Sequence, residues 1–153
     1  MKSNKLCSVV KWLIANSSRL ILALVLIFSG IVKLIDPHGT EYKIEDYALS
    51  FGVSEFLPIY APLVLAIALA MFEFCMGVNL LFVINRRLTS TLVLIFLTIF
   101  TPFTLYLAIE NPVHDCGCFG DAWKLTNWQT FIKNVILLSS AIIMTMYHRL
   151  QSR

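Results

Sequence analysis

Hydrophobic residues gather in four long runs along the chain, and short polar segments separate these runs. The runs cover about residues 20–35, 61–84, 88–109 and 131–147. A helix needs roughly 20 apolar residues to span about 30 Å of hydrocarbon, so the first and last runs need flanking residues to complete a span. Inside lipid the backbone must pair with itself, which favours helices. The pattern therefore predicts an all-α membrane protein, a four-helix transmembrane bundle in one domain over residues 1–153.

Helix-breaking residues lie between the runs. Asp36-Pro37-His38-Gly39 is expected to end the first helix, and Glu110-Asn111-Pro112 is expected to end the third. Asn85-Arg86-Arg87 is expected to form a tight turn between the second and third helices. Pro58 and Pro62 lie where the second helix could begin, because the first helical position tolerates proline.

The segment after the first run has a helical spacing of its own. Between about Asp36 and Tyr60, the apolar residues Ile44, Tyr47, Ala48 and Phe51 recur at i, i+3, i+4 and i+7. This spacing predicts a short amphipathic helix that lies on the membrane or caps the bundle.

Composition supports a lipid environment. Of the 153 residues, 58% are hydrophobic and 14% are charged, whereas a soluble domain has about 25% charged residues. The formal net charge is +3. Basic residues facing anionic lipid headgroups explain this charge, so no nucleic-acid partner is expected.

The basic residues also predict an orientation. Eight of the twelve Lys and Arg residues lie in the two terminal segments and at the predicted turn between the second and third helices, where no acid occurs. These eight are Lys2, Lys5, Lys11, Arg19, Arg86, Arg87, Arg149 and Arg153. The positive-inside rule therefore predicts that both termini are cytoplasmic and that the loops at about 36–60 and 110–127 face outward.

Two cysteines in the second outer loop give the sharpest chemical signal. Cys116 and Cys118 are separated by Gly117. Residues i and i+2 lie within the usual Cα separation for a disulfide, and Gly117 relaxes the backbone restriction that a side chain would impose. Because strained disulfides tend to be labile and oxidising, the pair suits a dithiol that cycles between its two redox states.

Other interpretations of this loop stay open. Cys116 and Cys118 could form a structural disulfide or pair with a partner protein. With His114 they could supply three zinc ligands, but a structural zinc site normally has four, and no fourth is evident, so no metal is expected. A protonated His114 could instead stabilise a thiolate. Cys75 is interpreted as a small packing residue within the second helix, and Cys7 as a reduced thiol of the cytoplasmic segment.

Glu73 is the only acid inside an apolar run. An ionisable group at that depth is costly and suggests a functional site, such as a proton or ligand site. Ala66, Ala70 and Gly77 share its helical face, and small residues permit close helix packing, so Glu73 is expected to face the bundle.

The partner of Glu73 is left open by the sequence. Lys33 could turn inward to meet it or extend outward toward the membrane surface. Ser29, Thr101 and Thr104 are neutral candidates. A protonated glutamic acid that only holds helices together is the structural alternative.

Three segments resemble a known family. The stretch 28–37 (FSGIVKLIDP) resembles the exit of the first helix in the DoxX-like membrane proteins, and 73–81 (EFCMGVNLL) resembles their second helix. The segment 115–120 (DCGCFG) is similar to the motif of the MauE branch, the methylamine-utilisation membrane proteins. The resemblance extends from Arg19 to about Tyr147.

The resemblance implies a four-helix protein of the bacterial inner membrane. The MauE branch is linked to maturation of the disulfide-rich small subunit of methylamine dehydrogenase. The wider DoxX-like group includes a subunit associated with quinone-linked sulfur oxidation.

We therefore expect a membrane thiol–disulfide redox protein that supports maturation or electron transfer of envelope proteins. Cys116 and Cys118, on the periplasmic side, would exchange disulfides with a thioredoxin-like or other envelope protein. Electrons would pass to or from a membrane quinone held near Glu73.

Two other classes of function are alternatives. One is a non-enzymatic scaffold or assembly factor with a structural cysteine pair. The other is a small-molecule transporter that uses Glu73 as a proton site, although the chain shows neither a second intramembrane charge nor paired broken helices.

Overall fold

The computed structural model describes residues 2–56, 58–110 and 125–151, and the regular elements there are helices. The elements are α1 (Lys2–Ile35), α2 (Pro37–Ser50), the 3-10 turn η1 (Ser54–Phe56), α3 (Ala61–Phe82), α4 (Arg86–Glu110) and α5 (Asn127–Gln151). Four of them are long and apolar enough to cross a membrane, over Val9–Ile35, Ala61–Phe82, Arg86–Glu110 and Asn127–Tyr147. The predicted all-α fold with four membrane spans is confirmed.

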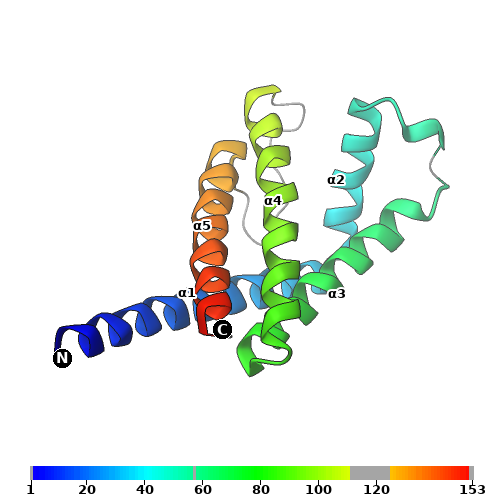
Figure 1. Cartoon of the computed structure of the whole chain (residues 1–153). Helices are drawn as coiled ribbons and strands as arrows, with labels where there is room; N and C mark the ends of the chain where they lie inside the picture. Colours follow the sequence, from blue (N-terminus) through cyan, green and yellow to red (C-terminus); the bar gives the residue numbers. More distant parts are fainter. Residues whose placement is uncertain (1, 57, 111–124, 152–153) are drawn as a thin grey trace.

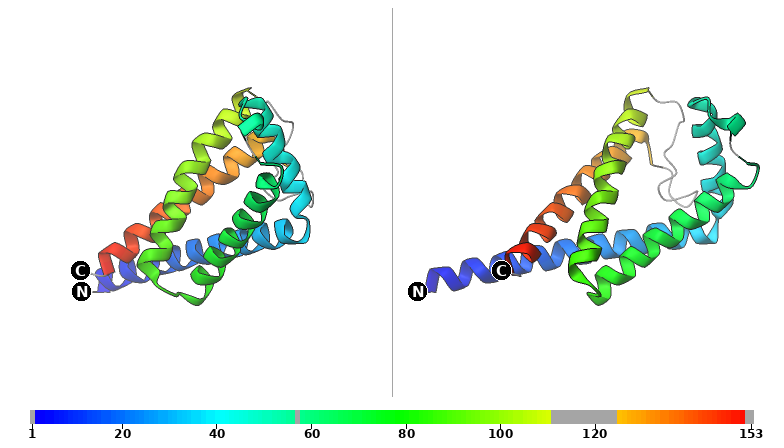
Figure 2. Two further views of the ribbon diagram at one scale, coloured as in Figure 1. Left: turned by 90° about the vertical axis from the view of Figure 1, so that its right-hand side faces the viewer. Right: turned by 45° about the vertical axis from the view of Figure 1, so that its right-hand side comes forward.

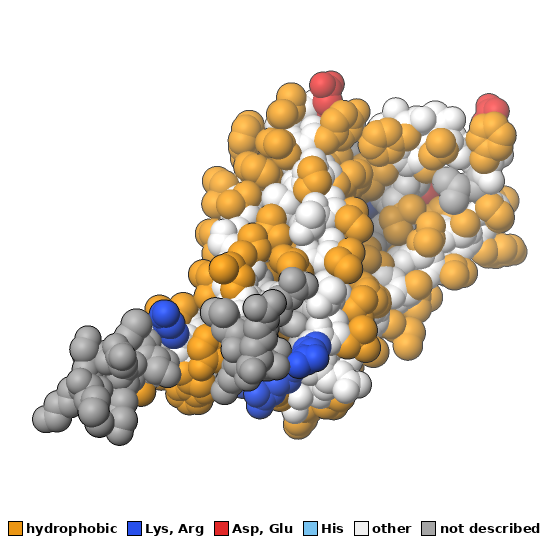
Figure 3. All heavy atoms as spheres, in the orientation of Figure 1, with side chains coloured by type: hydrophobic (Ala, Val, Ile, Leu, Met, Phe, Trp, Pro, Cys, Tyr) orange, Lys and Arg blue, Asp and Glu red, His pale blue; other side chains and the backbone are white. Residues whose placement is uncertain are grey.

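Most of the large apolar side chains point away from the bundle. Only 33–39% of each candidate span is buried against the rest of the protein, and hydrophobic atoms dominate the face shown in Figure 3. Leu24, Val64 and Ile99, each from a different span, are more than 60% exposed. A soluble monomer rarely exposes such extensive apolar surface, so these faces contact lipid.

The first membrane helix is much longer than the predicted run at 20–35. Helix α1 begins at Lys2 and continues through Asn16, Ser17, Ser18 and Arg19 without interruption. These polar residues interrupt the hydrophobic run, but each costs a helix only a few tenths of a kcal/mol, less than about 0.7. The polar residues therefore obscured the start of the helix in the sequence.

Two predicted breaks have a different role in the structure. Asp36 ends α1 but caps α2, since its side chain accepts a 3.2 Å hydrogen bond from the Gly39 amide, and Pro37 occupies the first turn. The predicted turn at residues 85–87 is shifted, because Arg86 and Arg87 already belong to α4. The chain reverses at Val83–Asn85, where Val83 (φ 61°) and Asn85 (φ 44°) adopt left-handed conformations.

The last helix begins four residues before its predicted start at 131. Thr126 and Gln129 form a reciprocal cap, with the Thr126 amide donating to Gln129 Oε1 (3.1 Å) and the Gln129 amide donating to Thr126 Oγ1 (3.3 Å). This Thr-x-x-Gln arrangement is a capping box, which satisfies amides that the first turn would leave unpaired.

The helices pack as two pairs that converge toward the end with the α3–α4 turn and separate toward α2 (Figure 2). Helix α1 packs most extensively on α3, and α4 packs on α5, while α1 also contacts α5 (Figure 1). The shared core contains Leu22, Ala23, Met76, Leu80, Val93, Leu97, Leu137, Ala141 and Met144.

Both termini lie at one end of the molecule, together with the turn between α3 and α4 (Figure 2). Helix α2 lies at the other end, as do the last turn of α4 and the first turn of α5. Exposed Arg86 and Arg87 begin α4 at the end with the termini, and exposed Glu110 ends α4 at the opposite end. The predicted cytoplasmic location of the termini stays a prediction.

Helix α2 caps the end that lies away from the termini. It packs on α3, and its Ala48 is buried. Its Tyr47 ring meets Phe103 of α4 edge-on at 5.7 Å, and Phe51 stacks on Tyr106 at 5.7 Å. The predicted amphipathic helix is therefore present and joins α3 to α4.

Candidate functional site

Glu73 lies on the face of α3 that packs into the bundle. Ala66, Ala70 and Gly77 share that face and are buried with it, as predicted, and Glu73 is only 4% exposed. The small side chains leave room for α1 to approach, which places the carboxylate against that helix instead of against lipid.

Glycine residues set the distance between α1 and α3. A Cβ atom at Gly30 would lie 2.8 Å from the Phe74 Cβ atom and 2.9 Å from the Ala70 carbonyl oxygen. A Cβ atom at Gly77 would lie 2.7 Å from Cγ1 of Ile27. Each helix thus supplies one glycine to the crossing, and the backbones approach closely on both sides of Glu73.

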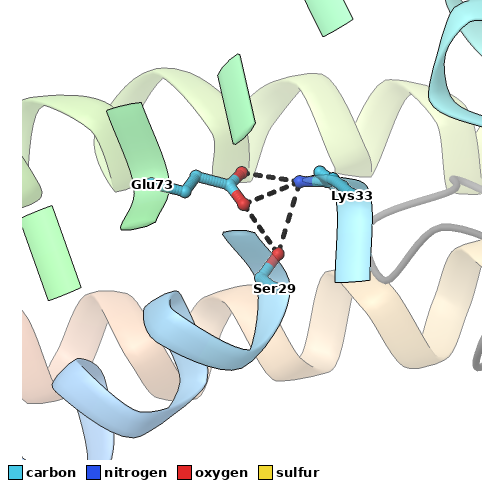
Figure 4. Close-up of polar contacts among 3 residues, drawn as sticks. All are labelled: Ser29, Lys33 and Glu73. Atoms are coloured by element: carbon cyan, nitrogen blue, oxygen red, sulfur yellow. Dashed lines mark hydrogen bonds and ion pairs between the residues drawn. The ribbon is translucent and has the colours of Figure 1, made fainter. Parts of the chain in front are cut away.

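At this crossing, Glu73 meets two side chains of α1 (Figure 4). The Lys33 amine donates to both carboxylate oxygens, at 2.7 Å each. The Ser29 hydroxyl donates to Glu73 Oε2 at 2.7 Å, and Lys33 also donates to Ser29 Oγ at 3.3 Å. Ser29 and Lys33 are one helical turn apart, so one face of α1 supplies both. We call Ser29, Lys33 and Glu73 the buried polar cluster.

The buried polar cluster is closed to bulk solvent. Lys33 is 4% exposed and Ser29 is 6% exposed. Burying an isolated charge at such a position would cost roughly several kcal/mol of free energy. Pairing of opposite charges offsets part of that cost. A carboxylate and an amine joined by short hydrogen bonds can also exchange a proton between Oε and Nζ, which is the chemistry of a proton site.

The inward orientation of Lys33 resolves the two possibilities that the sequence left open. It adds a second ionisable group to the interior of the bundle, so the earlier count of one intramembrane charge was wrong. The count failed because Lys33 lies only two residues from the end of α1, where lysine often extends toward the membrane surface.

The two threonine candidates do not contact the buried polar cluster. Thr101 donates to the Leu97 carbonyl of its own helix at 2.7 Å. Thr104 donates to the Thr101 carbonyl and accepts a 3.2 Å bond from Asn134, which ties α4 to α5. The sequence analysis did not single out Asn134, although it is a polar residue inside the fourth apolar run.

None of the predicted cysteine positions belongs to the buried polar cluster in the part of the chain that the structure describes. Cys116 and Cys118, with His114, fall in residues 111–124, outside the described residues. Cys75 is a free thiol on the outside of the bundle, not a packed interior residue. Cys75 follows Glu73 by two residues, which corresponds to a rotation of about 200° around the helix axis. The two side chains therefore lie on nearly opposite faces of α3. The expectation of a packing role for Cys75 is therefore wrong.

The fold and the buried polar cluster define a class: a multi-pass α-helical membrane protein with an ion pair inside its bundle. A family model described as "Methylamine utilisation protein MauE" matches residues 10–147. The chain therefore belongs to the MauE family. Searches among curated proteins and among solved structures found no significant match.

Proposed function

We propose that this protein is a thiol–disulfide redox protein of the bacterial inner membrane that serves envelope proteins, in keeping with its membership of a family named for methylamine utilisation. The observation that carries the proposal is the buried polar cluster. The cluster lies toward the end of the bundle at which α4 ends and α5 begins, and residues 111–124 connect these two helices in the sequence. Ionisable groups are expensive in a membrane interior and mark functional sites there.

The exchange chemistry belongs to Cys116 and Cys118. A thiolate of one cysteine attacks a disulfide of the partner protein and forms a mixed disulfide, and the second cysteine then resolves it. The products are a disulfide between Cys116 and Cys118 and a reduced dithiol in the partner, or the reverse. His114, when protonated, would stabilise the attacking thiolate. The partner is a thioredoxin-like or other disulfide-containing envelope protein.

Electrons and protons that the cysteine pair releases need a second carrier. A membrane quinone, if bound, would accept or donate two electrons and two protons. Lys33 and Ser29 would be the donors to a quinone carbonyl oxygen, but both already donate to Glu73, so the quinone would have to replace part of those hydrogen bonds. Glu73 would hold the proton at its carboxylate and exchange it with the Lys33 amine, which lies 2.7 Å away.

The first test is disulfide trapping with single cysteine variants. We expect Cys116→Ser or Cys118→Ser to accumulate a mixed disulfide with the envelope partner, because the remaining thiol attacks but no second thiol resolves the product. Non-reducing electrophoresis and mass spectrometry would identify the adduct, and the double variant is the control. If neither single variant captures a protein, and the wild-type pair resists mild reductant, the scaffold alternative replaces this proposal.

The second test separates the role of Glu73 from its packing. Glu73→Gln keeps the size and a hydrogen-bonding tip but cannot ionise. We expect the protein to fold, with a lower free energy of unfolding because Lys33 loses its anion, and the reoxidation of the cysteine pair in membranes to stop, while Glu55→Gln, an exposed acid at the same end, retains full activity. Unchanged reoxidation in Glu73→Gln would make the cluster a structural contact only.

A further inference from the structure

A second polar region lies at the opposite end of the bundle, where the termini are. It is a cavity of about 310 Å³, lined by residues of α1, α4 and α5 and by the end of α3. Its polar and aromatic lining consists of Trp12, Asn16, Arg19, Arg86 and Tyr147. This volume holds several water molecules, each of which occupies about 30 Å³ in the liquid.

The extended start of α1 builds one wall of this cavity. Trp12, Ala15, Asn16 and Arg19 follow the i, i+3, i+4, i+7 spacing, so they share one helical face. Helix α4 begins at Arg86, so the positive end of its dipole lies at the same wall as the Arg86 side chain. The cavity thus combines two guanidinium groups with a helix N-terminus.

Arg19 is partly buried, and its donors are incompletely satisfied. Its Nε atom is buried and has no hydrogen-bond partner among the residues that the structure describes. Arg19 also lines a smaller adjoining cavity with Leu80 and Met144, so apolar side chains surround part of it. A buried donor left unpaired is costly, which indicates that an external acceptor completes the site.

The segments that line this cavity contain no acidic side chain. No Asp or Glu occurs in residues 1–35, 74–109 or 122–153, the segments that supply every wall of the cavity. No acidic side chain lies among the described residues that line the cavity with Arg19 and Arg86. An anion from outside the chain would supply the missing negative charge.

We propose that this cavity binds a phosphate group, with Arg19 and Arg86 as its charged ligands and the headgroup of an anionic phospholipid as the favoured source. Arginine is suited to phosphate because its planar fork donates two parallel hydrogen bonds. Trp12 and Tyr147 are the residue types that lie at the headgroup level of a bilayer. Exposed Leu20 and Ile21, which follow Arg19 along α1 toward the membrane interior, present apolar surface for acyl chains.

The test uses the full chain with Trp12 as its only tryptophan, obtained by replacing Trp123 and Trp128 with Phe. The protein is reconstituted in phosphatidylcholine vesicles that contain a small fraction of brominated phosphatidylglycerol, and quenching of Trp12 reports lipid at the cavity. Brominated phosphatidylcholine measures non-selective contact. We expect selectivity for phosphatidylglycerol of about tenfold, the value of one charge-assisted hydrogen-bonded contact.

Adjacent arginines supply a matched pair of variants. Arg86 lines the cavity, whereas the neighbouring exposed Arg87 is not among the residues that line it. We expect Arg86→Gln and Arg19→Gln to abolish the selectivity, and Arg87→Gln to retain it. Because Arg86 is exposed at a helix start, its replacement leaves the fold intact, which circular dichroism would verify.

Each outcome decides the proposal. If inorganic phosphate relieves the selective quenching in wild-type protein but not in Arg86→Gln, the site binds phosphate and soluble phosphate is also a source. If inorganic phosphate has no effect while the selectivity depends on Arg86, a lipid headgroup is the source. If Arg86→Gln and Arg87→Gln lower the selectivity equally, or wild-type protein shows none, general surface charge explains the basic residues and the proposal is wrong.

Discussion

Lys33 and Glu73 show how much one pair of side chains contributes to this bundle. The Lys33 Nζ atom lies 2.7 Å from the Glu73 carboxylate in a buried region of the bundle. The Ser29 hydroxyl donates a further hydrogen bond to the same carboxylate. Removing one member of a buried pair is far more damaging than removing both, because the remaining charge loses its partner. The pair can therefore be dissected by a double-mutant cycle.

We expect Lys33→Met to lower the free energy of unfolding by about 3–5 kcal/mol, because Glu73 would be left buried without a cation. Adding Glu73→Leu to that variant should restore much of the loss. Denaturant titration of the purified protein in detergent, followed by circular dichroism, would measure both changes. Lys11→Met, a change of the same chemistry at an exposed position of α1, serves as a control. Additive effects of the Lys33 and Glu73 substitutions would show that the two residues do not interact.

At the scale of the elements, the crossing of α1 and α3 positions the buried polar cluster. Its geometry depends on Gly30 and Gly77, because each lies against the backbone of the facing helix. Replacing a glycine inside a helix with alanine usually stabilises a protein, because alanine has the higher helix propensity. These two should show the opposite sign.

We expect Gly30→Ala and Gly77→Ala each to destabilise the protein, by about 1–3 kcal/mol, because the added methyl group overpacks the crossing. Propensity alone would predict a gain of about 1 kcal/mol. Thermal unfolding in detergent gives the sign, and Ser139→Ala on the exposed face of α5 is a control for a small helical change. Stabilisation by both glycine substitutions would contradict the close packing of α1 on α3.

The elements also show what the sequence could predict. Four apolar runs were sufficient to predict four spans, because lipid leaves the backbone few alternatives. Helix ends were harder to place, since Asn16 and Arg19 interrupt the apolar pattern without interrupting α1. The capping residues Thr126 and Gln129 carried a readable signal for the start of α5. The contact between Lys33 and Glu73 joins positions 40 residues apart, and no local pattern encodes it.

At the scale of the whole molecule, charge is distributed unevenly between the two ends. The end with both termini holds Arg19 and Arg86, which line one cavity, and Arg87 in the first turn of α4, whereas Glu55 of η1 and Glu110 at the end of α4 lie at the opposite end. From this separation the positive-inside rule predicts that the basic end is cytoplasmic. The redox proposal depends on this orientation, because Cys116 and Cys118 require an oxidising compartment to cycle.

Orientation can be measured by labelling single cysteines in intact cells. In a chain whose four native cysteines are replaced by serine, we expect Glu55→Cys to react with a membrane-impermeant thiol reagent, because Glu55 is exposed at the end that holds α2. Arg87→Cys should react only after the cells are permeabilised, since that exposed position lies at the basic end, which the positive-inside rule retains in the cytoplasm. Labelling of both positions in permeabilised cells verifies that each thiol is accessible. Reaction of Arg87→Cys but not Glu55→Cys in intact cells would reverse the orientation, place Cys116 and Cys118 in a reducing compartment, and contradict the proposed exchange with envelope proteins.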